Sequence, residues 1–507
     1  MSKTIDERNL QRILSIGVAL TAERDMNRLL NTILTEAIAI TDCDAGTLYL
    51  LEDDKLHFKI MHNHSLGIFL GGEGVPVGLP PLELSEANVA SYVTIHRNME
   101  NIADVYVSDK FDFTGPKQYD NLTGYRTQSM LVVPLLNNRD EIIGTLQLMN
   151  AMDRDKNVIP FAKEYEEIFR SVSSLAAIAV TNMRFTEENR ALFQSLVEVL
   201  AAAIDERSPY NAYHTYNVVE LTKGYVDFIN KKHNEGRTNI YFSPESAEQI
   251  VMAAWLHDIG KIITPLDIMD KSTRLGDKLP LVLLRLEAIA ATERANYLEG
   301  KTGEADYARL AAEISEASAL CQSANAGAPA GDEELALIRS YGERRCIMAD
   351  GRVQPWLTPD EIECLGIRYG TLTPAERRTM EEHVEITGRL LEKIRFSRQY
   401  RNVSTYAVNH HEKLNGHGYP GHKTGSELPL GARIITIMDI FEALTAKDRP
   451  YKSPIPFERS FAILSEMAES GEIDAELVQW LIEWKSTVSP VNPGSPGSSG
   501  SPGSPGA

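Results

Sequence analysis

The 507-residue chain has few cysteines, and no two of them form a CxxC pair: Cys43, Cys321, Cys346 and Cys364. Scattered thiols of this kind argue against a zinc finger and are typical of a reducing compartment, where they stay buried and unpaired. Long apolar runs are also missing. No stretch of about 18 uncharged apolar residues occurs, which excludes a membrane-spanning helix. Residues 1–8 lead into a charged amphipathic helix instead of the apolar core of a signal peptide. We therefore expect a cytoplasmic protein without a membrane partner.

Positive charge is scarce as well. The sequence has 51 lysine and arginine residues against 71 aspartate and glutamate residues, which gives a formal net charge of −20. Binding to DNA or RNA polymers without sequence preference needs a basic surface, so we exclude nucleic acid polymers as partners. The charge leaves open a small phosphate-bearing ligand, because a bound metal ion supplies positive charge locally. The length suggests about three domains.

The first third of the chain changes from a helical to an alternating pattern. Apolar residues in 8–40 recur mostly at three and four positions, which predicts a helix. Two pairs of strands follow, at 46–51 with 56–61 and at 129–134 with 142–149, each pair separated by turn residues. A helix, antiparallel strands and a further helix predict an α+β domain of the size of a sensor module.

These strands carry a resemblance. Ala45-Gly-Thr-Leu-Tyr-Leu50, the strand pair 129–149 and Asn150 at its exit resemble a GAF domain, which would cover residues 1–182. The stretch 121–127 is similar to the GAF domains that bind cyclic nucleotides. The motif Asn-Lys, Phe and Asp-Glu of that subset corresponds here to Asn150-Ala151, Phe161 and Tyr165-Glu166. The resemblance implies a cyclic nucleotide at the GAF domain, although the sequence departs from this motif.

Residues 161–205 predict one long helix that links the sensor to the rest of the chain. Heptad spacing relates Ile168, Val172, Leu175 and Ala179, and it resumes at Phe193, Leu196 and Leu200. Asn182, Thr186 and Asn189 lie between the two sets. Polar residues in a coiled-coil seam lower stability and can fix the register. We expect a dimerising linker helix and hence a homodimer; the alternative is a helix that packs only on its own domain.

The remainder of the chain is predicted to be helical. Segments 206–275 and 371–485 surround an insertion, 276–370, which is rich in Ala, Glu and Leu and predicts a helical hairpin. Residues 486–507 are rich in Gly, Ser and Pro and predict a disordered tail. The fold class is therefore multidomain, with an α+β sensor domain before an all-α domain that carries a helical insertion.

A first chemical motif, His257-Asp258-Ile-Gly-Lys261, ends the apolar helical run 250–256. Imidazole and carboxylate ligands suit a divalent cation, and a carboxylate can bridge two. Lys261 lies four residues after His257 on the same helix face, where it could hold a phosphate oxygen of a substrate. The alternative is a core histidine beside a surface aspartate and lysine.

A second motif, His410-His411 followed by Gly418-Tyr419-Pro420, decides between these interpretations. Adjacent helical residues project about 100° apart, so the two histidines suit two metals, or one metal and one substrate contact. Together with His257-Asp258 the motif resembles the HD-GYP family, which would cover residues 206–485. The resemblance implies a metal-dependent phosphohydrolase domain and cyclic di-GMP as the substrate.

The resemblance also implies the remaining site residues. His214, His257, Asp258 and Asp439 would hold one metal, and Asp258 would bridge to a second metal held by His383, His410 and His411. Iron, manganese or nickel suit these ligands. Asp258 and Lys261 would be catalytic, and the contacts to substrate would come from Lys261, Arg449, Lys452 and Tyr419. Glu412 is expected to orient a neighbouring histidine from the second ligand shell.

The sequence departs from the family at two places. Tyr210 stands four residues before His214, where the variant with three metals has a glutamate, so we expect two metals. The insertion 276–370 lengthens the spacing from His257 to His383 and could cover the active-site mouth, shape substrate choice or serve dimerisation.

The expected reaction is hydrolysis of cyclic di-GMP to pGpG, with further cleavage to GMP left open, under control of the GAF domain. Three alternatives stay open. The substrate could be another cyclic dinucleotide, such as cyclic GMP-AMP. The chain could be a non-catalytic receptor for a cyclic dinucleotide or for a GGDEF-type partner. Finally, the GAF domain could carry the main role as a regulator gated by a cyclic nucleotide.

Overall fold

The computed structural model describes residues 16–20, 22–208, 213–327, 329–446 and 455–487. The chain divides into two compact units, Met1–Phe193 and Gln194–Ala507, each with its own core. None of the helices in the described ranges is both long and apolar enough to cross a bilayer. The predicted tail, together with Tyr210, Arg449 and Lys452, lies outside the described residues.

The first unit is built on one antiparallel sheet with the strand order β3-β2-β1-β7-β6-β5. Its main strands are β1 (Cys43–Glu52), β2 (Lys55–Asn63), β3 (Ile68–Gly71), β5 (Glu100–Ile102), β6 (Met130–Leu136) and β7 (Ile142–Met152). Two short strands pair at its margins, β4 (Leu82–Glu83) with β2 and β8 (Val158–Ile159) with β7. All four predicted strands are confirmed.

The turn between β1 and β2 explains why this hairpin forms so tightly. Asp53 and Asp54 both adopt positive φ angles, 48° and 58°, as a two-residue hairpin turn of the I′ type requires. Aspartate tolerates this backbone region better than most residues with a side chain. The turn fixes the register that places Glu52 opposite Lys55.

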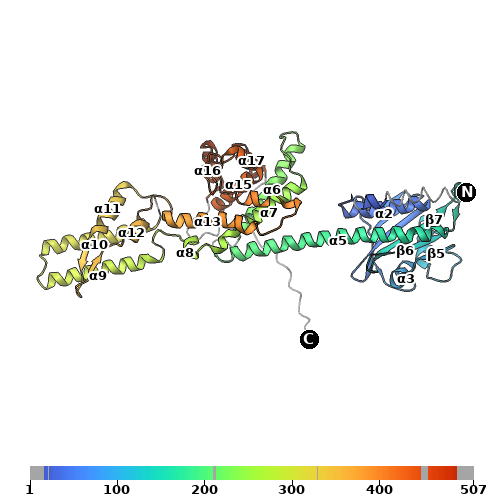
Figure 1. Cartoon of the computed structure of the whole chain (residues 1–507), viewed down its shortest axis with the longest axis horizontal. Coiled ribbons are helices and arrows are strands. Elements are labelled where there is room, and N and C mark those ends of the chain that lie inside the picture. Colours follow the sequence, from blue (N-terminus) through green and yellow to red (C-terminus); the bar gives the residue numbers. More distant parts are fainter. Residues whose placement is uncertain (1–15, 21, 209–212, 328, 447–454, 488–507) are drawn as a thin grey trace, which may run out of the picture. The chain divides into compact units, whose positions relative to one another are not determined.

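Helices cover both faces of the sheet. On one face, α2 (Met26–Thr41) and the first part of α5 (Glu164–Asp205) enclose a core that includes Leu34, Leu48 and Phe169 (Figure 1). On the other face, α3 (Val89–His96) packs against β6 and β7, and α4 (Thr114–Thr123) follows it in the chain. The α+β class expected for this unit is confirmed.

The helix predicted at 161–205 is present as α5, but the predicted seam is wrong in its first part. Val172 is only 3% exposed and belongs to the core of the first unit, so it cannot face another chain. Most exposed apolar residues of α5 follow a different spacing, by three, four or seven positions. They are Leu175, Phe185, Leu192, Leu196 and Val199, with Asn182 and Asn189 in the same stripe, while Leu200 is exposed beside it. This set, from Leu175 to Val199, is called the α5 stripe below.

The second unit is helical around α15. Its helices outside the insertion are α6 (His214–Asn234), α7 (Pro244–Leu256), α8 (Leu266–Met269), α13 (Pro374–Leu391), α14 (Val403–Ala407), α15 (Leu430–Thr445), α16 (Phe457–Glu469) and α17 (Ala475–Thr487). Helix α15 is buried along most of its length and packs against α6, α7, α14, α16 and α17. A helix apolar on all sides is stable only in such a setting. The expected helical class is confirmed.

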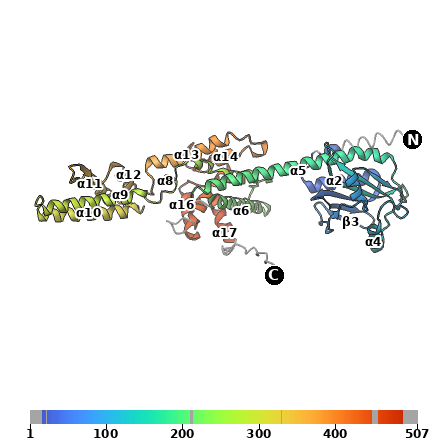
Figure 2. The same cartoon turned by 90° about the horizontal axis from the view of Figure 1, so that it is seen from below.

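The insertion contains the predicted helical hairpin, α9 (Leu279–Leu298) and α10 (Glu304–Asn325), which lie side by side (Figures 1 and 2). It is not wholly helical, however. Helices α11 (Asp332–Glu343) and α12 (Pro359–Leu365) pack on the hairpin, and a two-stranded sheet of β9 (Arg345–Ile347) and β10 (Val353–Pro355) lies between them. Gly351 lies in the turn between these strands with a φ of 81°, which glycine adopts readily. The insertion has its own hydrophobic core.

Candidate metal centre

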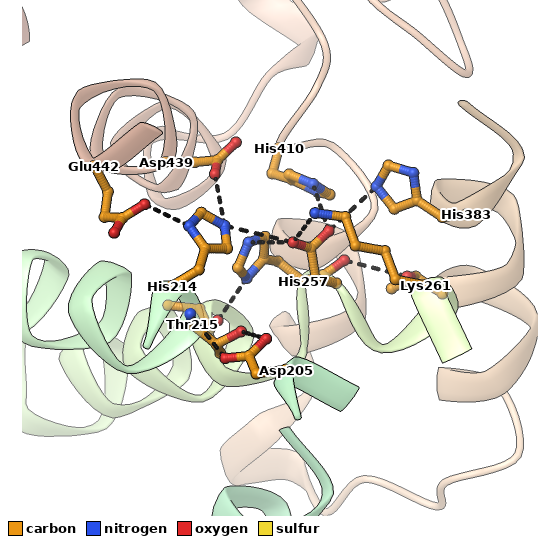
Figure 3. A network of polar contacts seen from close by, with 12 residues as sticks. Asp205, His214, Thr215, His257, Lys261, His383, His410, Asp439 and Glu442 are labelled. Carbon is orange, nitrogen blue, oxygen red and sulfur yellow. Dashed lines mark hydrogen bonds and ion pairs between the residues drawn. The ribbon is translucent and has the colours of Figure 1, made fainter. Parts of the chain in front are cut away.

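Five segments of the second unit bring their polar side chains to one place (Figure 3). His214 begins α6, His257 and Asp258 follow α7, His383 lies on α13, His410 and His411 follow α14, and Asp439 lies on α15. Except for His411, which is partly exposed, all are buried, with at most 9% of their surface exposed. The structure thus brings together all seven residues that the resemblance named as metal ligands.

Three of the histidines are oriented in the same way. The Nδ1 atoms of His257, His383 and His410 each lie 2.5–2.7 Å from the backbone carbonyl oxygen three residues earlier. A carbonyl accepts a hydrogen bond, so each Nδ1 carries the proton and each Nε2 has a free lone pair. All three Nε2 atoms are buried and make no hydrogen bond with any described residue. Buried imidazole lone pairs without a donor are suited to binding a metal ion.

Asp258 lies at the centre of these lone pairs. Its Oδ1 is 3.2 Å from Nε2 of His383 and 3.8 Å from Nε2 of His410, while its Oδ2 is 3.2 Å from Nε2 of His257. Two atoms that both present lone pairs need a proton or a cation between them. Ligands held at about 2.0–2.2 Å from one ion lie roughly 3–3.5 Å apart, so the two separations of 3.2 Å fit shared metal coordination and the third, 3.8 Å, is slightly longer.

The ligand atoms form two groups that share Asp258. One consists of Asp258, His383, His410 and His411, and the other of His214, His257 and Asp258. Asp439 adjoins the second group, with its Oδ1 3.2 Å from Nε2 of His214. A carboxylate common to two groups is the natural bridge between two cations. The donor set of imidazole and carboxylate therefore fits divalent metal ions.

One residue of this site was missed from the sequence. Glu442 is 4% exposed, and its Oε2 lies 2.5 Å from Nδ1 of His214 on the side opposite Asp439. A carboxylate on the outer nitrogen fixes the tautomer of a ligating histidine and makes the ligand more basic. Glu442 lies three residues after Asp439 on α15, so the same helix face carries both, and this spacing was the signal available in the sequence.

The charges of the site are mutually dependent. Burial alone would raise the pKa of Asp258, but Lys261 and His257 beside it hold that pKa well below its usual range. Burial alone would lower the pKa of His214, but contacts with Asp258, Asp439 and Glu442 raise it well above its ordinary value. Burial lowers the pKa of His411 to about 3. Asp258 therefore stays ionised, and His411 stays neutral, with a lone pair that suits a metal ion.

Lys261 and Tyr419 lie at the edge of the two groups. Nζ of Lys261 donates to Oδ2 of Asp258 at 2.5 Å, and 18% of the lysine side chain is exposed. The ring of Tyr419 lies 4.9 Å from the ring of His411. Burial, followed by the charge of Asp258, raises the pKa of Tyr419, so its hydroxyl keeps its proton at neutral pH. Both residues therefore lie directly beside the candidate ligands, Lys261 at Asp258 and Tyr419 at His411.

Glu412 has a different role from the one expected. Its carboxylate accepts hydrogen bonds from the backbone N–H groups of Gly421 and Lys423 and does not contact a histidine. It therefore holds the Gly-Tyr-Pro turn, and the expectation that it orients a neighbouring histidine is wrong. Gly418 in this turn lies so close to Glu412 that a Cβ would fall 2.4 Å from the glutamate Cα.

The His257–Lys261 turn is fixed against α13. A Cβ at Gly260 would lie 1.9 Å from the carbonyl oxygen of His383, so only glycine allows this approach. Thr387 then bridges the two elements, accepting from the N–H of Gly260 and donating to the carbonyl oxygen of His257. The separation between His257 and His383 in space is thus set by backbone contact, although the insertion separates them in sequence.

Two family models match the chain, a GAF domain model over residues 25–180 and an HD domain model over residues 356–477. The chain carries a GAF domain and an HD domain. The HD domain is a metal-dependent hydrolase domain, and the matched segment contains His383, His410, His411 and Asp439. His214, His257 and Asp258 precede it in the sequence and join it in space through the contacts above.

Three curated relatives resemble parts of the chain. The 3′3′-cGAMP-specific phosphodiesterase 3 of Vibrio cholerae is 40% identical over 19% of this chain and 20% of the relative. The cyclic di-GMP phosphodiesterase of Thermotoga maritima is 33% identical over 22% of this chain and 28% of the relative. The cyclic di-GMP phosphodiesterase response regulator RpfG of Xanthomonas campestris pv. campestris is 35% identical over 19% of this chain and 25% of the relative. The chain thus spans between 20% and 28% of the length of these relatives.

Among solved structures, the GAF domain from an Acinetobacter phosphoenolpyruvate-protein phosphotransferase matches 37% of this chain and 99% of its own, at 17% identity and a TM-score of 0.28. With a TM-score this low, the GAF assignment rests on the family model and on the sheet described above.

Proposed function

We propose that the HD domain is a phosphodiesterase that hydrolyses a cyclic dinucleotide with the help of two divalent metal ions. The observation that carries this proposal is the set of three buried Nε2 lone pairs directed at one shared carboxylate, Asp258. A structural core would not leave such lone pairs without donors. Iron, manganese and nickel all suit imidazole and carboxylate ligands. The buried thiols of the chain are in keeping with activity in the cytoplasm.

The chemistry divides between the metal ions and the residues of the chain. Divalent cations bound there would supply Lewis acidity and a water of lowered pKa for attack on phosphorus. Lys261 would offset negative charge on the non-bridging phosphate oxygens. Tyr419, with its protonated hydroxyl and its ring beside His411, would contact the substrate. Water adds to phosphorus, the bond to the 3′ oxygen breaks, and that oxygen leaves with a proton.

Cyclic di-GMP is the proposed substrate, with linear pGpG as the first product. Relatives named for cyclic di-GMP and for cyclic GMP-AMP both resemble the chain, at 33% and 40% identity. Cyclic GMP-AMP is therefore the second candidate. The two substrates present the same phosphodiester to the metal groups and differ in one base.

The test combines metal analysis with turnover. The full chain is purified without oxygen, its metal content is measured, and cyclic di-GMP and cyclic GMP-AMP are incubated with it and separated by chromatography. We expect about two metals per chain and the appearance of a linear dinucleotide. Asp258→Asn should lose both metal and turnover, because both groups share this carboxylate. Asp227→Asn removes the same charge from an exposed position of α6 and serves as the matched control.

The possible outcomes separate the alternatives. Turnover of cyclic GMP-AMP but not of cyclic di-GMP would identify cyclic GMP-AMP as the substrate. Bound metal and tight dinucleotide binding without turnover would replace the enzyme by a receptor, which could then relay its signal to a GGDEF-type partner. Failure to bind metal, also after reconstitution with iron or manganese, would overturn the proposal.

We also propose that the GAF domain regulates this activity through α5 in a homodimer. Support comes from the α5 stripe, whose exposed apolar residues alternate by three and four as in a coiled coil. A cyclic nucleotide is the proposed GAF ligand. Calorimetry of the full chain with cyclic AMP and with cyclic GMP tests this. If neither nucleotide produces binding heat, a cyclic nucleotide is ruled out as the GAF ligand.

A further inference from the structure

Helix α9 of the insertion is apolar on two opposite faces. Val282 and Ile289 on its inner face are fully buried in the core of the insertion. Its outer face exposes Leu281 to 62%, Leu284 to 62% and Leu298 to 72%. A helix that is hydrophobic on all sides is normally buried on all sides. Within the described part of the second unit, nothing covers the outer face of α9.

The exposed apolar residues of this face are evenly spaced. They are Leu281, Leu284, Ala288, Ala291, Ala295 and Leu298, called the α9 stripe from here on. Successive members are three or four positions apart in strict alternation, which is the spacing by which one helix presents a seam to a second helix. No polar residue interrupts the stripe.

The α9 stripe is symmetric about its midpoint. Its spacing is the same in both directions, so two copies that run antiparallel match residue for residue. Leu284 then lies opposite Ala295 of the second copy, and Ala288 opposite Ala291. Leu281 lies opposite Leu298, so large side chains meet at the two ends of the stripe and small ones at its centre, where the two helices can approach closely. A two-fold axis brings identical surfaces together in this way in most homodimers.

The charges beside the stripe fit the same arrangement. Glu287 and Arg294 are both exposed, and they immediately precede Ala288 and Ala295 on one side of the stripe. In the antiparallel pair, Glu287 of each copy lies beside Arg294 of the other. Such flanking charges set the partner and the orientation of paired helices.

We propose that the insertion is a dimerisation arm, in which the α9 stripe pairs antiparallel with the α9 stripe of a second copy of this chain. The occupant is a second copy because the spacing of the stripe is the same in both directions and the flanking charges, Glu287 and Arg294, complement each other between two antiparallel copies. This contact is distinct from the α5 stripe and does not depend on the proposed enzymatic activity.

Disulfide mapping in the full chain tests the arrangement. All four native cysteines are buried, so a cysteine on the stripe is the accessible thiol. Leu284→Cys and Ala295→Cys are purified separately and oxidised alone and as an equal mixture. Antiparallel pairing predicts a covalent dimer only in the mixture. In the Leu284→Cys variant alone, the two introduced thiols would lie about 16 Å apart along the axis, beyond the reach of a disulfide, which needs Cα atoms within about 7 Å.

Ser340→Cys, an exposed position on α11, is mixed with Leu284→Cys to measure random collisions. If each single variant forms a covalent dimer and the mixture gives no higher yield, the two helices pair in parallel. If the yield of covalent dimer does not exceed the collision level, the face does not self-associate. Either result overturns the proposal.

A charge exchange provides a second test that misfolding cannot imitate. In the mixture of Leu284→Cys and Ala295→Cys, adding Glu287→Arg to both chains places two arginines together at each flank. We expect the yield of covalent dimer to fall several-fold at low salt. Adding Arg294→Glu as well restores opposite charges and should restore the yield. Loss of yield in both backgrounds would contradict this register.

Discussion

At the scale of single residues, the metal centre depends on how each histidine is held. Three ligands use a carbonyl of their own helical turn, whereas His214 uses the carboxylate of Glu442. A carbonyl within the same turn is available to any histidine at such a position. A carboxylate from another helix is not, so Glu442 is expected to be a specific requirement of the candidate metal group that contains His214.

Replacing Glu442 tests this positioning role. Glu442→Ala should lower the affinity of the group around His214 for a divalent metal by about 10–100-fold, the usual cost of losing such a partner. Glu442→Gln keeps an acceptor oxygen and should recover part of the loss. Cobalt titration followed by its visible absorption measures the affinity independently of turnover. Equal behaviour of both variants, or no change in either, would contradict the role.

The limits of prediction at this scale follow from chemistry. Histidines beside aspartates at helix ends carry a recognisable pattern, and the structure brings these residues together. Glu442 shows only its spacing of three residues from Asp439, and Glu412 shows no pattern, because a buried glutamate is distinguished mainly by what it contacts. The contact of Glu442 joins two helices that are distant in sequence, and the contacts of Glu412 depend on how the loop 412–423 folds back, so the sequence did not predict either role.

At the scale of elements, a buried ion pair ties α9 to α12. Arg285 donates from two nitrogens to the carboxylate of Glu361, at 2.6 and 2.7 Å, and Glu361 also caps α12 through Thr358. Burial alone would raise the pKa of Glu361, but Arg285 and the Thr358 backbone hold it below its ordinary value. A carboxyl group whose pKa is lowered by folding stabilises the folded form at pH values above its unfolded-state pKa. This stabilisation is lost as the pH falls through the folded-state pKa.

Glu361→Gln should therefore destabilise the insertion at pH 7 by roughly 1–3 kcal/mol, the loss of a charged hydrogen bond. Below the unfolded-state pKa of about 4.3, the unfolded wild-type chain takes up a proton that the folded chain does not yet bind, so the difference between the two chains should shrink as the pH falls towards the folded-state pKa. Urea unfolding at pH 7 and pH 3.5, followed by helix content, measures both differences. Glu363→Gln, the exposed neighbour on α12, is the control. A difference independent of pH would refute this account.

Helix α5 shows what a pattern of spacing can and cannot predict. The 3.5-residue repeat predicted the helix and the polar residues within its exposed stripe. It did not reveal which of two interleaved stripes faces inward, since Val172 and Leu175 are equally apolar and only the sheet decides which is buried. The register of a seam thus depends on tertiary packing and not on the local sequence.

The α5 stripe yields its own prediction. Asn189→Leu replaces a polar seam residue by one that would bury its side chain, and it should strengthen the dimer by on the order of 1.5 kcal/mol. Analytical ultracentrifugation measures the dissociation constant. If the GAF domain signals by shifting the seam, turnover in this variant should no longer respond to a GAF ligand. Glu187→Gln, exposed and outside the seam, should behave as the wild type. An unchanged, still regulated enzyme would exclude the seam as transmitter.

At the scale of the whole molecule, the two units have separate cores, and the candidate metal ligands all belong to the second unit. Ions that bind only the folded state stabilise it by about 2.7 kcal/mol at a hundredfold excess over the dissociation constant. Without metal, the lone pairs of His257, His383 and His410 meet the charge of Asp258 with no cation between them. The stability of the second unit should therefore depend on metal, and that of the first should not.

Calorimetry of the full chain with and without a chelator tests this separation. We expect two transitions, of which one falls by about 5–10 °C on chelation, since each kcal/mol shifts a domain of this size by about 2–4 °C. The other should keep its temperature, because the GAF unit contributes no ligand to either metal group. Asp258→Asn should show the lower temperature before chelation and no further shift after it. A common shift of both transitions would mean that the units unfold together, and no shift at all would argue that the lone pairs around Asp258 bind no metal in the purified protein.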